Sequence, residues 1–527
     1  MNVIAEEQPE LIRGLLRPDA YDHPVSEIRL IETHISWVIL TGNFAYKIKK
    51  PVNLGFLDFS TLDKRRFCCN EELRLNSRLA APIYLEVLPI TGSATQPALK
   101  DQGEAIEYVI KMIQFPQQAQ LDNMLADGKL DKVHMDAIAT LVAGFHQRAD
   151  VAADDSVFGD PEHVYQPVAE NFLQIRQHLH TDNYDADLAV LEDWSRQSFE
   201  SLQTVFKQRK RDGFIRECHG DMHLRNLVWF DGEPLAFDCL EFNPALRWID
   251  TLSEVAFLVM DLQDRQQPEL AQRFLNSYLE KSGDYQGLQV LRFYLVYRAL
   301  VRAKVDAIRA GQAGISDAEK HEAEKEFLAY LELARSYTRR RQPALIITRG
   351  LSASGKSTIT QPLLELIGAI RIRSDVERKR LFGILPDADG KAAIGKGIYS
   401  AEAGIKTYQK LAELADTILA VGFTVIVDAA FLEFAQREPF SQLANKSGVP
   451  FIILEFTASA DTLRQRIKAR TRDVSDADLS VLEHQLATTE PIRDSELSRL
   501  ISINTEATVD ASTLRERIHE LIENVDA

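Results

Sequence analysis

Eight consecutive residues in the second half of this chain have the types and spacing needed to hold a phosphate group. They read Gly350-Leu-Ser-Ala-Ser-Gly-Lys-Ser357 and fit G-x-x-x-x-G-K-[ST] at every fixed position. Glycines let such a loop turn its backbone N–H groups inward, and the helix that follows adds partial positive charge. Lys356 would reach the β- and γ-phosphates of a nucleoside triphosphate, and the Ser357 hydroxyl would ligate Mg²⁺. The residues expected to contact the nucleotide are Gly350, Ser352, Ala353, Ser354, Gly355, Lys356, Ser357 and Thr358.

A second group of residues has the spacing of a phosphoryl-transfer site of unrelated design. His219-Gly-Asp-Met-His-Leu-Arg-Asn226 places Asp221 and Asn226 five apart, as in the H-x-D-x-x-x-x-N loop of protein kinases. The aspartate would accept the proton of an acceptor hydroxyl, and the asparagine would reach a metal ion across the transferring group. A turn at 230–234 and a short apolar strand then lead to Asp238, which a hairpin of this size returns toward Asn226. Asp238 is therefore a second candidate ligand for Mg²⁺.

Charged side chains follow the strands expected after the phosphate loop. Asp375 comes directly after one strand, and a carboxylate there can take a proton from a bound hydroxyl. Asp428 ends the next strand, is Walker-B-like and would hold the Mg²⁺ shell. No catalytic glutamate follows it, which disfavours a mechanical ATPase. Arg466 and Arg470 lie four apart on one face of a later basic helix. That placement matches the lid of small P-loop kinases, whose arginines stabilise transition-state charge, and a solvated charged helix is the alternative.

Apolar runs predict the elements that would position these groups. Five β-type runs alternate with helices in the second half, which predicts a five-stranded parallel sheet with functional groups at the carboxyl ends of its strands. The runs are 344–348, 369–372, 424–427, 451–456 and 500–503. The first half predicts a hairpin (36–40 and 44–48), a helix (62–79), a buried strand (107–113) and then mostly helix to about residue 211. A basic turn closed by Pro343 marks a boundary between a domain at 1–335 and a domain at 342–527.

The loop His219–Asn226, taken with Phe237-Asp238, resembles the aminoglycoside phosphotransferase and choline kinase branch of the protein-kinase-like fold, over roughly residues 30–330. This resemblance implies an α+β, two-lobed first domain. It implies Asp221 as catalytic base, with Asn226 and Asp238 as Mg²⁺ ligands. It also implies that Lys47 contacts the nucleotide phosphates and pairs with an acidic residue of the next helix, Glu72 in preference to its neighbour Glu71.

Residues 344–527 resemble a second group, the P-loop kinases that include chloramphenicol phosphotransferase, zeta toxins and 5′-polynucleotide kinases. This α/β domain follows the kinase-like domain in one chain. The fusion resembles the bacterial family described as bifunctional aminoglycoside phosphotransferase/ATP-binding protein, and the likeness covers nearly the whole chain. It implies ATP and Mg²⁺ as cofactors.

Composition limits the classes of partner. A net charge of −17 argues against a general binder of polyanions. The four cysteines show no C-x-x-C spacing, and the first ten residues have no apolar core of a signal peptide. No apolar run approaches the length of a membrane span. We therefore expect a cytoplasmic protein with no membrane partner.

These observations predict an ATP- and Mg²⁺-dependent phosphotransferase that acts on a hydroxyl group of a small molecule. One alternative is a nucleic acid 5′-hydroxyl kinase in the second domain, where basic side chains gather around Asp375; a nucleic acid partner is the less favoured reading. These side chains are Arg371, Arg373, Arg378, Lys379 and Arg380. The other alternative is an ATP-responsive regulator with a degenerate first kinase lobe.

Overall fold

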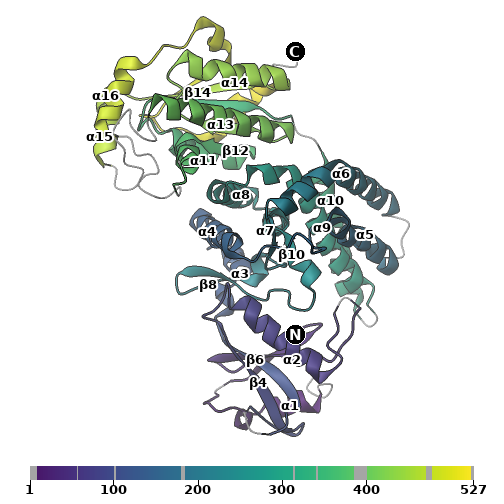
Figure 1. The fold of residues 1–527 in the computed structure, drawn as a ribbon. Coiled ribbons are helices and arrows are strands. Elements are labelled where there is room, and N and C mark those ends of the chain that lie inside the picture. The colour runs from purple at the N-terminus through teal and green to yellow at the C-terminus, as the bar shows by residue number, and fades with distance from the viewer. Residues whose placement is uncertain are drawn as a thin grey trace. The chain divides into compact units, whose positions relative to one another are not determined.

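The computed structural model describes residues 9–25, 27–55, 57–99, 103–179, 184–312, 315–339, 342–384, 400–469 and 478–523 (Figure 1). The chain divides into two compact units. The first holds Met1–Glu170 with Gln203–Asp261, and the second holds Asn171–Leu202 with Leu262–Ala527. Helices α5 (Pro161–His178) and α6 (Asp185–Arg211) contribute residues to both units. Each unit is made of two separate segments of the chain that contact one another. The predicted domain limits, 1–335 and 342–527, stay a prediction.

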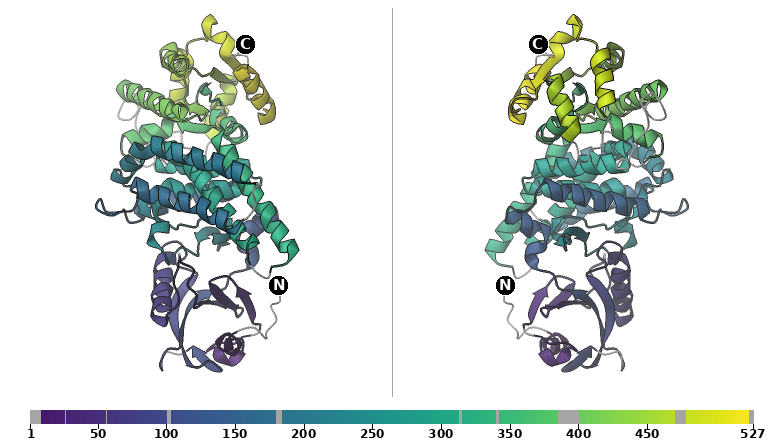
Figure 2. Two further views of the ribbon diagram at one scale, coloured as in Figure 1. Left: turned by 90° about the vertical axis from the view of Figure 1, so that its right-hand side faces the viewer. Right: turned by 90° about the vertical axis from the view of Figure 1, so that its left-hand side faces the viewer.

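The first unit is built on a six-stranded antiparallel sheet in the order β1-β2-β3-β6-β4-β5. Its strands are β1 (Arg29–Glu32), β2 (Ser36–Leu40), β3 (Phe44–Lys49), β4 (Tyr84–Ser93), β5 (Gln96–Leu99) and β6 (Glu107–Ile113). Helix α2 (Leu62–Asn76), capped by Thr61, packs along one face (Figure 2), and α1 (Glu10–Leu15) packs on the other. On β3, Ala45 belongs to the α2 face while Tyr46 and Ile48 belong to the α1 face. Because side chains alternate along a strand, Lys47 and Lys49 both point to the α2 face.

Helices and short strands complete the first unit. They are α3 (Leu121–Ala126), α4 (Lys132–Arg148), the pair β7 (Ile215–Glu217) and β10 (Trp248–Asp250), the hairpin β8 (Leu227–Phe230) and β9 (Glu233–Ala236), and most of α7 (Thr251–Asp264). The hairpin turns at Asp231 and Gly232, which have φ values of 50° and 87°. An antiparallel sheet with one long helix, followed by a largely helical region that carries His219–Asn226, is the order of a protein-kinase-like fold. The predicted fold class is confirmed for this half.

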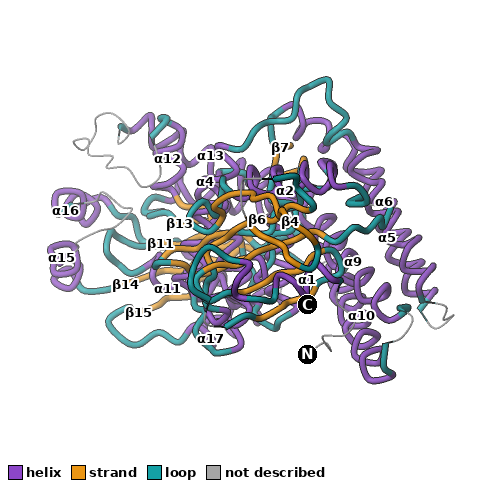
Figure 3. The backbone as a smooth tube through the Cα atoms, turned by 90° about the horizontal axis from the view of Figure 1, so that it is seen from below, coloured by secondary structure: helices purple, strands orange, loops and turns teal. Residues whose placement is uncertain are grey.

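The second unit contains a five-stranded sheet in which every pairing is parallel, in the order β12-β13-β11-β14-β15. Its strands are β11 (Leu345–Arg349), β12 (Ile370–Arg373), β13 (Val425–Asp428), β14 (Phe451–Thr457) and β15 (Leu500–Asn504). Helices α11 (Lys356–Ile367) and α17 (Ala511–Glu523) lie on one face, and α13 (Ala401–Ala420) lies on the other (Figure 3). This arrangement confirms the predicted α/β P-loop domain.

Further helices belong to the second unit. Helix α8 (Pro268–Ser282) packs against α11, and α9 (Leu288–Ala310) and α10 (Asp317–Thr338) form a long antiparallel pair. The others are α12 (Ser374–Leu381), α14 (Phe434–Ser447), α15 (Ala460–Ala469) and α16 (Leu479–Thr488). Within the described residues, none of the helices combines the length and the apolar character required to cross a membrane.

Candidate active sites

The phosphate loop joins β11 to α11 in a conformation that only small residues permit. Gly350 has a φ of 156°, and a Cβ there would lie 2.7 Å from both the Phe456 carbonyl oxygen and Ser354 Oγ. Ala353 and Gly355 also have positive φ values, 63° and 87°. Ser354 Oγ is buried and has no hydrogen-bond partner among the described residues. Left-handed residues turn successive N–H groups to one side, and an unsatisfied buried hydroxyl at that point suits a loop that waits for phosphate oxygens.

Two expected Mg²⁺ ligands meet beside this loop. Ser357 Oγ donates a hydrogen bond to Asp428 Oδ2 at 2.7 Å, which joins the first turn of α11 to the carboxyl end of β13. Asp428 is 5% exposed. Lys356 Nζ donates to the carbonyl oxygens of Gly350 and Leu351, each at 2.9 Å. Hydroxyl and carboxylate oxygens are the ligands that Mg²⁺ prefers, and the lysine lies where the β- and γ-phosphates would come, so these residues fit Mg²⁺ and a nucleotide.

The candidate base of this site, Asp375, stands in the first turn of α12. Its Oδ1 lies 3.2 Å from Arg378 Nη1 in the next turn of the same helix. The strand before it, β12, is the neighbour of β13, and Arg373 is the register partner of Asp428. Carboxyl ends of neighbouring parallel strands share one edge of the sheet, so Asp375 and Asp428 lie at the same edge.

Arg466, in the last part of α15, is tied to the phosphate loop. It donates to the Ala353 carbonyl oxygen at 3.3 Å, and to Thr505 at 2.9 Å for the hydroxyl and 2.7 Å for the carbonyl oxygen. The arginine therefore joins the loop to the segment that follows β15. Arg470, its predicted companion, lies outside the described residues.

A cavity of about 550 Å³ opens beside the loop. It is lined in part by Ala353, Gly355, Thr358, Arg466, Thr505 and Ala507. On another side, Gln485 of α16 accepts a hydrogen bond from the Ser352 N–H at 2.8 Å. Sequence reasoning missed Thr505, Ala507 and Gln485. Position after the last strand of the predicted sheet was the one signal that pointed to the segment 505–507.

In the first unit, the structure brings together three residues that the sequence left more than twenty positions apart. Lys47 Nζ of β3 lies 2.8 Å from Glu72 Oε1 of α2, and it also donates to Asp238 Oδ1. Asp238 follows the β8–β9 hairpin with a φ of 64°, a strained conformation for a residue that is not glycine. Its backbone N–H donates to the Tyr84 hydroxyl at 3.3 Å. Glu71, the rejected alternative to Glu72, pairs instead with Arg247 at 2.9 Å.

A second lysine of β3, Lys49, shares this network. Lys49 Nζ lies 2.6 Å from Glu72 Oε2 and also pairs with Glu241, and it is 1% exposed. Burial works to raise the pKa of Glu72, but Lys47 and Lys49 outweigh it and lower the pKa to about 2. Burial raises the pKa of Glu241. The period of two along β3, which places Lys47 and Lys49 on one face, was the signal for Lys49.

The loop His219–Asn226 holds Asp221 and Asn226 in contact. Asn226 Nδ2 donates to Asp221 Oδ2 at 2.9 Å and to the Asp221 carbonyl oxygen at the same distance. His223 Nε2 lies 3.3 Å from Asp221 Oδ2. The His219 ring contacts the carbonyl oxygen of Phe237 at 2.8 Å. Because Phe237 precedes Asp238, the imidazole links the loop 219–226 to the segment that carries Asp238. Burial lowers the pKa of His219, which favours the neutral ring.

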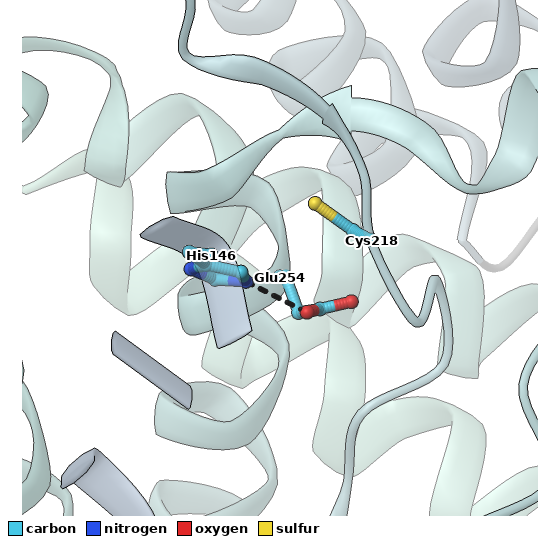
Figure 4. A group of neighbouring side chains, drawn as sticks. All are labelled: His146, Cys218 and Glu254. Atoms are coloured by element: carbon cyan, nitrogen blue, oxygen red, sulfur yellow. Dashed lines mark hydrogen bonds and ion pairs between the residues drawn. The ribbon is translucent and has the colours of Figure 1, made fainter. Parts of the chain in front are cut away.

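Buried carboxylates hold this loop from behind. Glu254 Oε1 accepts from the Gly220 N–H at 2.7 Å, and its Oε2 lies 2.8 Å from His146 Nε2 (Figure 4). Cys218 completes a buried group in which one ligand-type atom of each residue lies within 4.8 Å of the others. Both oxygens of Glu254 already have partners, so this group braces the loop. Asp250, the last residue of β10, lies in the strand paired with β7, which leads into this loop, and it accepts two hydrogen bonds from Arg209 at 2.6 and 2.7 Å.

A smaller cavity of about 240 Å³ lies at the β2–β3 turn. Gly42 and the segment Gln114–Gln118 are among its lining residues, and the Gly42 N–H donates to Gln114 Oε1 at 2.9 Å. The Gly42 turn and the segment after β6 thus face a common space in the first unit.

The predicted site residues within the described ranges fall into two groups, one in each unit. The first comprises Lys47, Glu72, Asp221, Asn226 and Asp238, and the second comprises the phosphate loop with Asp375, Asp428 and Arg466. A protein-kinase-like fold, a P-loop domain and these groups together define a phosphotransferase. A family model described as "AAA domain" matches residues 345–492.

The chain is 31% identical to an uncharacterized protein of Mycobacterium tuberculosis over 460 residues, which cover 86% of this chain and 89% of the relative. It therefore belongs to the same family as that mycobacterial protein. Among solved structures, an ethanolamine kinase of Plasmodium vivax is 12% identical and covers 59% of this chain and 84% of its own, with a TM-score of 0.36. A structure described as a putative kinase from Chloroflexus aurantiacus is 22% identical and covers 34% of this chain and 99% of its own, with a TM-score of 0.28.

Proposed function

We propose that this protein is an ATP- and Mg²⁺-dependent phosphotransferase with two separate kinase-type sites, each transferring the γ-phosphate to a hydroxyl group of a small molecule. This is the activity that the bacterial family described as bifunctional aminoglycoside phosphotransferase/ATP-binding protein would have. The observation that carries the proposal is the Ser357–Asp428 hydrogen bond of 2.7 Å. It joins the two candidate Mg²⁺ ligands next to the phosphate loop and at the same sheet edge as Asp375.

In the P-loop site, loop N–H groups and Lys356 would bind the β- and γ-phosphates, and Ser357 and Asp428 would hold Mg²⁺. When bound, Mg²⁺ offsets the negative charge of the phosphate oxygens. Asp375 would take the proton of the acceptor hydroxyl. The hydroxyl oxygen bonds to the γ-phosphorus while the bond between that phosphorus and the β–γ bridging oxygen breaks, which releases ADP. Arg378, 3.2 Å from Asp375, orients this carboxylate.

In the kinase-like site, Asp221 takes the acceptor proton and Asn226, which donates to Asp221 Oδ2, orients it. Asn226 and Asp238 would hold Mg²⁺ on the phosphate side of the base. Lys47, fixed by Glu72 at 2.8 Å, would contact the nucleotide phosphates. The direct Lys47–Asp238 contact supports this assignment, since it brings the phosphate-binding cation and a metal ligand to one point.

The basic side chains near Asp375 favour a small acceptor over a nucleic acid. Arg371 is 8% exposed and Lys379 2% exposed, and Arg380 is committed to Glu377 and to the Glu280 carbonyl oxygen. Side chains that are buried or paired within the protein do not form an open surface for a phosphate backbone. This supports a hydroxyl-bearing small molecule as acceptor.

The test is transfer of label from γ-labelled ATP by the full chain. The acceptor panel comprises aminoglycosides, amino alcohols, sugars, nucleosides and an oligonucleotide with a 5′-hydroxyl. Asp221→Asn is expected to lower the rate of transfer to one acceptor class, and Asp375→Asn the rate of transfer to another. Each rate should fall by at least about 10²-fold. Transfer that survives the double substitution contradicts both assignments. ATP binding without transfer to any acceptor would favour the regulatory alternative, and labelling of the oligonucleotide alone would favour the polynucleotide kinase.

A further inference from the structure

Helix α8 packs against one edge of the P-loop sheet, the edge formed by β12. Strand β12 is an edge strand, and such a strand presents unpaired N–H and C=O groups. Asn276 of α8 accepts a hydrogen bond from the Arg371 N–H at 2.8 Å and donates to the Ala369 carbonyl oxygen at 3.0 Å. Gln272, one turn earlier, donates to the same carbonyl oxygen at 2.7 Å. Side chains of α8 thus replace the missing neighbour strand and set the position of the helix along β12.

The same face of α8 presents a carboxylate to the active-site edge. Glu280 follows Asn276 by four residues, so it lies one turn further along that face. Its Oε1 lies 3.1 Å from Arg373 Nη1, and its Oε2 lies 3.9 Å from Arg371 Nη2. Arg373 is the last residue of β12, and its Nε lies 4.0 Å from Asp428 Oδ2. The Arg373 guanidinium therefore lies between Glu280 and a carboxylate expected to ligate Mg²⁺.

The electrostatics keep Arg373 charged in this position. Burial works to lower the pKa of Arg373, but Glu280, and after it Asp428 and Asp375, raise the pKa above its ordinary value. A cation with two anionic neighbours moves toward one when the other is removed. Loss of the Glu280 charge would therefore turn Arg373 toward Asp428, where it would compete with a divalent cation for the same oxygens.

We propose that Glu280 is a positioning residue of the P-loop site, which draws Arg373 away from Asp428 and so leaves the Asp428 carboxylate to Ser357 and Mg²⁺. The proposal rests on the proposed function of the P-loop site. It gives α8, which the sequence places in the first predicted domain, a direct role in the chemistry of the second.

The test is Mg²⁺-dependent ATP binding by the full chain carrying Lys47→Ala, which removes nucleotide binding at the other site. ATP affinity is measured by equilibrium dialysis with Mg²⁺ and again with EDTA. In this parent, Glu280→Gln is expected to weaken apparent Mg²⁺ affinity about tenfold, equivalent to about 1.4 kcal/mol, while ATP affinity in EDTA stays within about twofold. Adding Arg373→Gln to Glu280→Gln removes the competing cation and is expected to restore the Mg²⁺ affinity.

The control is Glu332→Gln on α10, which makes the same change in an exposed pair with Arg339 and is expected to leave both affinities unchanged. A Glu280→Gln protein that melts at a lower temperature but keeps the parent's Mg²⁺ dependence would overturn the proposal, since α8 would then be only structural. Failure of the double substitution to restore Mg²⁺ affinity would also overturn it. ATP binding by the Lys47→Ala parent is measured first. If the parent binds no ATP, the proposed function of the P-loop site fails independently of Glu280.

Discussion

Lys49 Nζ lies 2.6 Å from Glu72 Oε2, so the carboxylate that Lys47 contacts through Oε1 is held on both sides by lysines of one strand. Lys49 and its second partner, Glu241, are both buried. A glutamate fixed in this way cannot turn from Lys47 without leaving Lys49. Lys49 therefore helps to fix Glu72 and, through Glu72, the position of Lys47.

Lys49→Met is expected to destabilise the protein by about 3 kcal/mol, because it leaves Glu241 buried without its cation. Urea unfolding followed by circular dichroism measures this. The matched control is Lys129→Met, which breaks an exposed pair with Asp127 and should cost less than about 1 kcal/mol. Equal effects of the two substitutions would show that Lys49 does not support this network.

Asp250→Ala is expected to cost about 3–5 kcal/mol, since Arg209 is 3% exposed and would lose its bidentate partner. The Leu252 N–H would also lose the acceptor it contacts at 2.8 Å. The double variant Arg209→Met with Asp250→Leu should be more stable than Asp250→Ala, because neither charge remains buried. A double variant less stable than the single one would contradict this account, and thermal melts distinguish the cases.

The stability of the second unit should fall as the pH rises from about 4 to about 7. Burial, assisted by Glu326, raises the pKa of Asp306 in α9 to about 7, although Arg302 and Arg309 act in the opposite direction. An unfolded aspartate has a pKa of about 3.9, so the folded state holds the proton more tightly. The stabilisation is complete below the unfolded pKa and is lost as the pH approaches the folded one.

Asp306→Asn should therefore remove about 2 kcal/mol of pH-dependent stability between pH 4.5 and 8. Melting temperatures at the two pH values measure the effect. Asp416→Asn, at a half-exposed position near Lys446, serves as control and should keep the wild-type dependence. An Asp306→Asn profile that parallels the wild type would argue that Asp306 is ionised throughout this range.

Two equivalents of ATP should bind per chain in the presence of Mg²⁺. Lys356→Ala removes the cation that would contact the β- and γ-phosphates, and Lys47→Ala removes its counterpart in the first unit, so each should weaken one site by about 10²-fold or more. Equilibrium dialysis then gives one equivalent for either variant and none for the double variant. A single equivalent in the wild type would contradict the two-site proposal.

Sequence patterns predicted much of the fold because the strands and the hairpin have local signals, namely short apolar runs and turn residues. The five β-type runs after residue 344 correspond to β11 to β15, and the hairpin at 36–48 corresponds to β2 and β3. The pairing of Glu72 with Lys47 in the structure matches the choice made by resemblance, whereas position alone left Glu71 equally suitable. Three lysines within residues 47–50 are compatible with a strand end that faces solvent, and only the packing of α2 against the sheet places Lys49 inside.

The sequence by itself determined both phosphate-site motifs, because G-x-x-x-x-G-K-S and H-x-D-x-x-x-x-N act through turns and spacings of a few residues that local chemistry dictates. Only the tertiary structure decided which distant groups complete them. Glu254 accepts from Gly220, Glu241 pairs with Lys49, and Glu280 of α8 meets Arg373 ninety-three positions later. Such pairs depend on how helices pack against sheets, and no local period encodes that packing.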